Sequence, residues 1–100
     1  MHAVIAIFAM PRPDSEHPAL RGIVDRTSRE PGFVTGYWTH DGERAYNMLV
    51  FETLEAAEQR AADVRGNTKF QEKAGIVLER VVVSEVIASA APQATAPTGG

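Results

Sequence analysis

The residues best suited to chemistry lie on one predicted hairpin. Two aromatic and β-branched segments flank Asp41-Gly42, a dipeptide typical of a tight β-turn. If Asp41 and Gly42 are the two central turn residues, His40 faces Glu43, and side chains two positions apart share one face of the hairpin. That face then carries Trp38, His40, Glu43 and Asn47.

This combination of side chains is suited to a phenolic or enolic substrate. An indole supplies an aromatic wall, an imidazole can remove a proton near neutral pH, and a carboxamide orients the substrate by hydrogen bonding. His40 and Asn47 are therefore our candidate catalytic residues. The candidate substrate-binding residues are Trp38, Tyr37, Tyr46 and Phe51.

Each candidate also has a structural interpretation. Trp38 fits a hydrophobic core, and His40 and Glu43 fit a solvated turn, which is the favoured interpretation for residues beside a loop tip. Asn47 needs a hydrogen-bond partner among its apolar neighbours, so both interpretations stay open for it. The two tyrosines are predicted as cross-strand neighbours on the opposite face, where packing at an interface is favoured over a substrate contact.

Composition argues against several other functions. The chain has no cysteine, and His2, His17 and His40 lack metal-ligand spacing, so we predict no metal site and no cofactor. Ten basic against thirteen acidic residues give a net charge of −3, which argues against nucleic-acid binding. The longest apolar run, Ala3–Met10, is too short to span a bilayer. We therefore expect a cytoplasmic protein with no membrane partner.

Hydrophobic periodicity predicts the elements that position these residues. Four segments rich in β-branched and aromatic residues are expected as strands: 3–9, 33–39, 45–51 and 76–87. Two amphipathic helices are expected between them, one capped by Asp14 or Ser15 and the other by Thr53. Residues 68–75 are expected to form a loop with about one helical turn.

The resulting order, β-α-β-β-α-β, is that of a ferredoxin-like α+β domain with an antiparallel four-stranded sheet. A chain of 100 residues has room for one domain. We place this domain over residues 1–87 and expect a flexible, uncharged tail over 88–100.

Both faces of the predicted sheet are apolar. One hairpin face would carry Phe33, Thr35, Tyr37, Tyr46, Met48 and Val50, and the other Val34, Gly36, Trp38, Ala45, Asn47, Leu49 and Phe51. Two helices cover only one face, and a large uncovered apolar face is an aggregation liability in a monomer. We therefore expect a homodimer. The alternative is that the long last strand curls over its own sheet.

The sequence resembles a known superfamily. Three segments carry the likeness, the first leading into the hairpin: Pro31–Trp38, Val50–Thr53 and Val81–Val86. They are similar to the dimeric α/β-barrel superfamily and, more narrowly, to small antibiotic-biosynthesis-monooxygenase-like proteins. The resemblance implies that two sheets form a barrel across a dimer, with a pocket between each sheet and its helices. It does not extend to the haem-degrading branch, whose first-strand asparagine is missing here.

Three functions follow as hypotheses, because this fold hosts many unrelated activities. The first is a cofactor-independent monooxygenase, an oxidoreductase acting on a small aromatic or polyketide-like compound that itself supplies the carbanion. The second is a non-catalytic ligand-binding or stress-linked dimer. The third is a purely structural or partner-binding dimer whose pocket is filled by Trp38, Phe51 and their neighbours.

Overall fold

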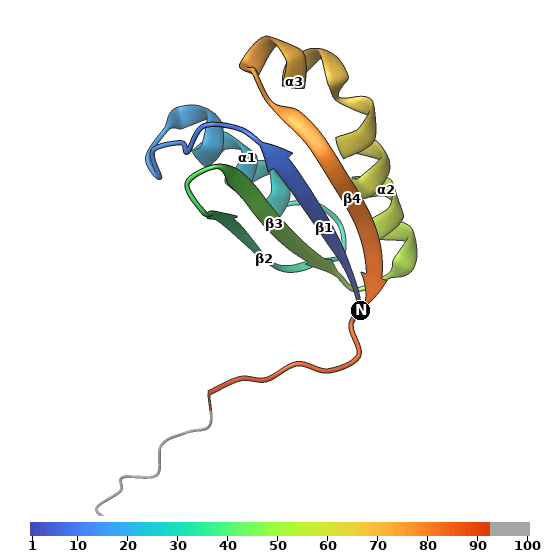
Figure 1. Cartoon of the computed structure of the whole chain (residues 1–100). Helices are drawn as coiled ribbons and strands as arrows, with labels where there is room; N and C mark the ends of the chain where they lie inside the picture. The colour runs from blue at the N-terminus through green and yellow to red at the C-terminus, as the bar shows by residue number, and fades with distance from the viewer. Residues whose placement is uncertain (93–100) are drawn as a thin grey trace, which may run out of the picture.

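The computed structural model describes residues 1–92 and contains the predicted β-α-β-β-α-β order with one helix added (Figure 1). The elements are β1 (His2–Ala9), α1 (Pro18–Ser28), β2 (Phe33–His40), β3 (Arg44–Phe51), α2 (Leu54–Gly66), α3 (Thr68–Ala74) and β4 (Val77–Glu85). The strands form one antiparallel sheet in the order β2-β3-β1-β4. The ferredoxin-like α+β prediction is confirmed. Most of the predicted tail, residues 93–100, lies outside the described part of the chain.

The added helix, α3, corrects the prediction of a loop with one helical turn. Its seven residues are too few to show a clear apolar period in the sequence. Two features stabilise it locally: Gly75 ends it in the left-handed conformation at φ 71°, and the Gln71 side chain donates a hydrogen bond of 2.8 Å to the Val64 carbonyl. The second contact attaches α3 to α2.

The hairpin between β2 and β3 has a longer turn than predicted. His40 pairs with Ala45 rather than with Glu43, because the Asp41 carboxylate accepts hydrogen bonds from the backbone N–H groups of Glu43 and Arg44, at 2.8 and 2.7 Å. This Asx turn takes Glu43 out of the ladder and leaves it exposed. The shift is an even number of positions, so the faces of the later hairpin residues are unchanged.

The first two residues of β2 do not follow the predicted alternation. The register shifts between Phe33 and Thr35, which places Phe33 on the helix side and leaves Val34 44% exposed. There Phe33 packs edge-to-face on Phe51, with ring centroids 5.8 Å apart. The predicted faces of Phe33 and Val34 were therefore wrong, because a bulge reverses the alternation on one side of it.

The core lies between α2 and the sheet. Ala57 and Ala61 on α2 are fully buried against Val4, Leu49 and Phe51, and their small side chains let the helix approach the strands closely. The predicted Thr53 cap is confirmed by a 3.1 Å hydrogen bond from the Ala56 N–H. For α1 the cap is His17, not Asp14 or Ser15.

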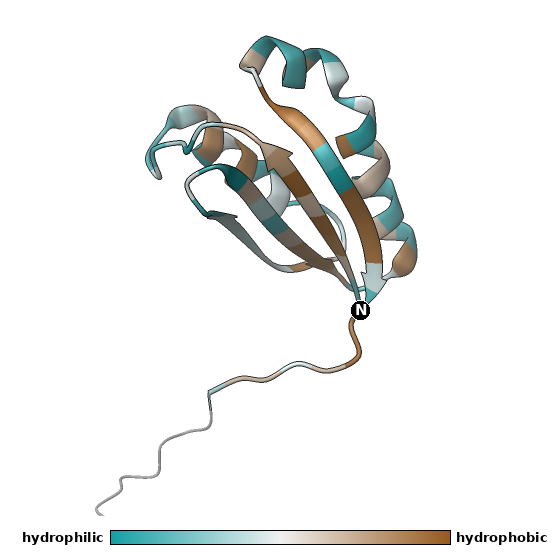
Figure 2. Ribbon diagram, viewed as in Figure 1, coloured by the Kyte–Doolittle hydropathy of each residue, from teal (hydrophilic) through white to brown (hydrophobic). Residues whose placement is uncertain are grey.

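The opposite face of the sheet, called the outer face below, is not covered by any helix of the described chain (Figure 1). Strands β1 and much of β4 are hydrophobic along their length (Figure 2). The most exposed large side chains of this face include Tyr37, Tyr46 and Met48. Within residues 1–92, no helix is both long and apolar enough to cross a membrane.

Candidate functional site

A cavity of about 630 Å³ lies between α1, the helix-facing side of the sheet and the junction of α2 with α3. Two of the strand residues that line it, Ala6 of β1 and Ala45 of β3, have small side chains and leave space that larger residues would fill. Leu20 and Ile23 of α1 face it from the other side and remain only partly buried. The cavity therefore exists because α1 does not pack down fully onto the sheet.

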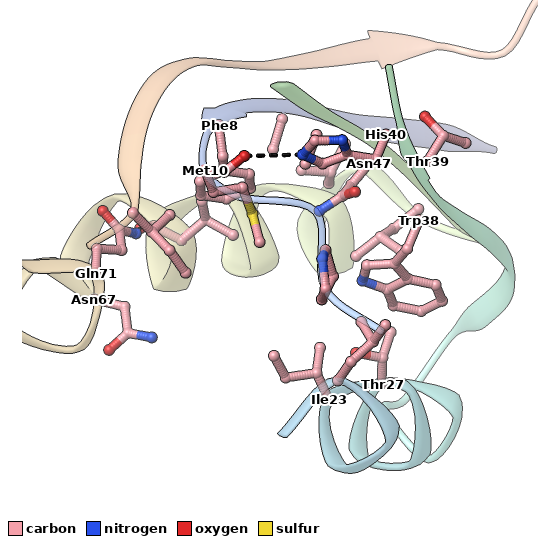
Figure 3. Close-up of a pocket in the computed structure, with 18 of the residues that line it drawn as sticks. Phe8, Met10, Ile23, Thr27, Trp38, Thr39, His40, Asn47, Asn67 and Gln71 are labelled. Carbon is pink, nitrogen blue, oxygen red and sulfur yellow. Dashed lines mark hydrogen bonds between the residues drawn. The ribbon is translucent and has the colours of Figure 1, made fainter. Parts of the chain in front are cut away.

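The structure brings together three of the predicted site residues. Trp38, His40 and Asn47 line the cavity from neighbouring positions of β2 and β3 (Figure 3). Trp38 pairs directly with Asn47 in the sheet. An open cavity beside these two residues contradicts the hypothesis of a pocket filled by Trp38 and Phe51.

The other three candidates lie elsewhere. Phe51 is 1% exposed in the core and does not line the cavity. Tyr37 and Tyr46 are on the outer face, where Tyr37 pairs with Met48 and Tyr46 with Thr39. They are thus diagonal neighbours, not the predicted direct pair, because the turn is longer than two residues.

Two polar groups in the cavity have no partner within the described chain. The Asn47 carboxamide and the Trp38 indole N–H make none of the hydrogen bonds found among residues 1–92, although both side chains are only half-exposed. A partly buried amide that no protein group satisfies is available to hydrogen-bond to a ligand in the cavity. This is the feature of the site that most directly indicates binding.

His40 is fully engaged by the backbone. Its Nε2 lies 2.8 Å from the Met10 carbonyl oxygen, and its Nδ1 accepts the Gly42 N–H at 2.9 Å. Figure 3 shows the first of these contacts. The imidazole thus joins the hairpin turn to the segment that follows β1.

Sequence reasoning missed several cavity residues. Arg60 of α2 contacts Glu30 in a partly buried ion pair that closes one end of the cavity. Thr27 of α1 is 1% exposed, and its hydroxyl has no hydrogen-bond partner among the described residues. The Arg60–Glu30 contact joins elements distant in sequence, so local periodicity gives no signal for it. Only the place of Thr27 in the apolar stripe of α1 indicated that it faces the sheet.

A separate polar cluster lies at the hairpin turn, on the outer face. The Tyr46 hydroxyl donates to the Asp41 carboxylate at 3.1 Å, which raises the pKa of Tyr46. The N–H groups of Arg44 and Glu43, together with that hydroxyl, hold the pKa of Asp41 below its usual value. Arg44 also donates to Glu79 of β4 at 2.5 Å, which raises the pKa of Arg44. Glu79 lies where the β1–β4 register shifts, between the pairs Ile7–Arg80 and Phe8–Leu78. This cluster fixes the turn but lies outside the cavity.

In the described part of the chain, no group of three His, Asp or Glu side chains lies close enough together to bind a metal ion.

No protein-family model matches the sequence, and no curated protein matches it significantly.

Similarity is found instead among solved structures. One is the 1.40 Å crystal structure of "a putative antibiotic biosynthesis monooxygenase" from Deinococcus radiodurans. It matches 94% of this chain and 100% of its own, with a TM-score of 0.67 and 16% sequence identity. At that identity the likeness establishes the fold and not the activity. The chain therefore shares the ferredoxin-like α+β fold of that crystal structure, and this fold is the one that the sequence predicts.

Proposed function

We propose that this chain forms a homodimer that binds a small aromatic or polyketide-like molecule in the cavity beside Trp38 and Asn47. The observation that carries the proposal is the pair of unpartnered polar groups, which lie beside apolar lining residues such as Ala6 and Leu49. The volume, about 630 Å³, is in the range of small-molecule sites. A planar ligand would stack on the indole while its oxygen atoms hydrogen-bond to the Asn47 carboxamide.

Oxygenation without a cofactor is the activity we propose for the bound molecule. In a hydroxylated polycyclic substrate with an acidic ring methylene, loss of a proton gives a carbanion, which adds to dioxygen. The peroxide then loses water and leaves a ring carbonyl. One oxygen atom stays in the product, the other leaves as water, and the methylene supplies all the electrons. The protein contributes binding, orientation and hydrogen bonds to the enolate oxygen.

Ligand binding without catalysis is the alternative, and a specific observation favours it. His40, the base that the sequence predicts for this site, is already engaged at both ring nitrogens by backbone groups. A general base needs a free lone pair within reach of the substrate proton. The activity assay below separates the two functions.

The single tryptophan makes binding directly measurable. Titration with a three-ring hydroxylated anthrone is expected to quench Trp38 fluorescence in a saturable way, one ligand to each chain. Asn47→Ala removes the free carboxamide and should weaken binding about tenfold, the usual effect of one lost hydrogen bond in an apolar site. Glu58→Ala, which changes an exposed side chain of α2 away from the cavity, is the matched control.

The same ligand tests catalysis. Under labelled dioxygen, product carrying one labelled oxygen atom, at a rate reduced in Asn47→Ala, supports the oxygenase. Saturable binding with no dioxygen uptake supports the non-catalytic alternative. Absence of saturable quenching with several ring sizes contradicts the binding proposal itself.

The dimer part of the proposal rests on the outer face. Tyr37 is 59% exposed and Met48 40% exposed on a sheet surface that no described helix covers. A second copy of the chain, related by a twofold axis, would bury this self-complementary surface. Sedimentation equilibrium at micromolar concentration is expected to give twice the chain mass of 10.8 kDa. A mass equal to one chain contradicts this part.

A further inference from the structure

We infer that His40 is a positioning residue that anchors the pocket segment Met10–Ser15, and that it is not the general base which the sequence favours among catalytic roles. This inference rests on the proposed function only in treating the cavity as a binding site. Its structural core concerns the unliganded protein.

The two backbone contacts determine the tautomer of the imidazole. A backbone N–H can only donate and a carbonyl oxygen can only accept. The Gly42 N–H therefore requires an unprotonated Nδ1, and the Met10 carbonyl requires a proton on Nε2. In neutral His40 the protonated ring nitrogen is Nε2.

In this tautomer, neither ring nitrogen of His40 is free to accept a proton from a bound molecule. Neutral imidazole has one ring lone pair available to accept a proton, and here that lone pair accepts the Gly42 N–H at 2.9 Å. The other nitrogen, Nε2, donates its proton to the Met10 carbonyl oxygen at 2.8 Å. A base acting on a bound molecule would first have to break the turn contact.

The segment that His40 anchors has little else to hold it. Pro11 and Pro13 have no N–H groups, so the chain between β1 and α1 cannot extend the sheet ladder. Its other hydrogen bonds are local, such as the Glu16 N–H to the Asp14 carboxylate at 2.9 Å. Within residues 1–92, the His40 contact is the one hydrogen bond that joins residues 10–16 to a distant element.

The same segment forms part of the cavity wall. Met10, Arg12, Pro13 and Ser15 all line the cavity, and Figure 3 shows Met10 and His40 meeting at its rim. Fixing the Met10 carbonyl therefore fixes the position of the wall. A bound molecule would contact a preorganised segment rather than one that must be ordered on binding.

Two substitutions separate the two contacts of the ring. The amide of Gln reaches the position of Nε2, so His40→Gln can still donate to the Met10 carbonyl. The shorter amide of Asn reaches only the position of Nδ1, so His40→Asn can still accept the Gly42 N–H but releases Met10. A general base is lost in both variants, whereas an anchor is lost only in His40→Asn.

The first experiment is long-range proton–nitrogen NMR of the unliganded wild type near neutral pH. It is combined with ¹⁵N relaxation of the backbone amides of Arg12, Asp14, Ser15 and Glu16 in all three proteins. We expect the Nε2–H tautomer, and increased segment mobility in His40→Asn but not in His40→Gln. The Nδ1–H tautomer, a mixture of tautomers, or equal mobility in the three proteins overturns the inference. The wild-type tautomer can be read even if a variant fails to fold.

The second experiment is anthrone binding by Trp38 quenching. His40→Asn should bind about fivefold more weakly than wild type, and His40→Gln within about twofold. Equal losses in both variants overturn the anchoring role. If no protein binds the ligand, the proposed function fails while the tautomer and mobility still decide the inference about His40.

Discussion

At the residue scale, packing on the helix side of the sheet requires a glycine at position 36. A Cβ built on Gly36 would lie 2.7 Å from Leu49 Cδ2 and 3.2 Å from the Phe33 ring. Neither neighbour is free to retreat, because Leu49 is in the buried core and the Phe33 ring packs on Phe51. Glycine here makes room for the packing that supports Trp38 two positions later.

Gly36→Ala is therefore expected to destabilise the fold by about 1–3 kcal/mol, the usual effect of overpacking. Urea unfolding followed by circular dichroism measures it. The control is Gly66→Ala at the end of α2, where a Cβ meets nothing within 4 Å and the change should be neutral or stabilising by about 0.5–1 kcal/mol. Equal stabilities of the two variants contradict this account.

The Asp41 carboxylate makes the turn sensitive to acid. Its pKa in the folded chain is lowered from 3.8 by backbone and tyrosine hydrogen bonds, so its charge stabilises the fold above the pKa of the unfolded chain. That stabilisation is lost as the pH falls through the lowered folded-state value. Asp41→Asn should be less stable than wild type near neutral pH, and the difference should shrink below about pH 4. A difference that is constant down to about pH 2.5 contradicts the linkage.

At the element scale, α2 is the helix that holds the core, and its first turn depends on Thr53. The hydroxyl accepts the Ala56 N–H, and Ala57, one residue later, is fully buried against the sheet. Thr53→Ala is expected to cost about 1 kcal/mol of folding free energy, and Thr53→Ser to restore most of it. Thermal and urea unfolding of the two variants measure this. An equal loss in both assigns the effect to the threonine methyl group instead of the cap.

The elements also show what the sequence could and could not predict. Strand alternation alone placed Trp38, His40 and Asn47 on one face, and an even shift of register left that result intact. The turn length was missed because the Asp41 side chain, not the Asp-Gly pair itself, sets it. The bulge that turns Phe33 inward is likewise decided by its contact with Phe51.

The chemistry of the site was the hardest to predict, because it depends on contacts between distant residues. His40 and Met10 are 30 positions apart, as are Glu30 and Arg60. A pattern of side-chain types indicated an imidazole near a pocket, but not that the backbone uses both its nitrogens. The residue types predicted a titratable imidazole at the pocket, but only the tertiary structure shows that both of its nitrogens already have hydrogen-bond partners.

At the scale of the whole molecule, the outer face decides the proposed assembly. Met48 lies on this face between Ile5 of β1 and Tyr37 of β2, so a charge there would be buried without a partner in a dimer and solvated in a monomer. Met48→Glu should therefore shift the sedimentation mass towards 10.8 kDa, because an unpaired buried charge is strongly destabilising. Ala62→Glu, on the exposed side of α2, introduces the same charge away from the sheet and should leave the mass unchanged.

Thermal unfolding gives an independent measure of the same assembly. If folding and association are coupled, the wild-type midpoint rises with protein concentration, because mass action stabilises the associated state. Met48→Glu should remove that dependence, and Ala62→Glu should retain it. A wild-type midpoint that is independent of concentration over about a hundredfold range, together with a one-chain mass, contradicts the dimer. In that case the exposed tyrosines and Met48 would remain on the surface of a monomer, while the cavity, which is built within one chain, would keep its proposed ligand.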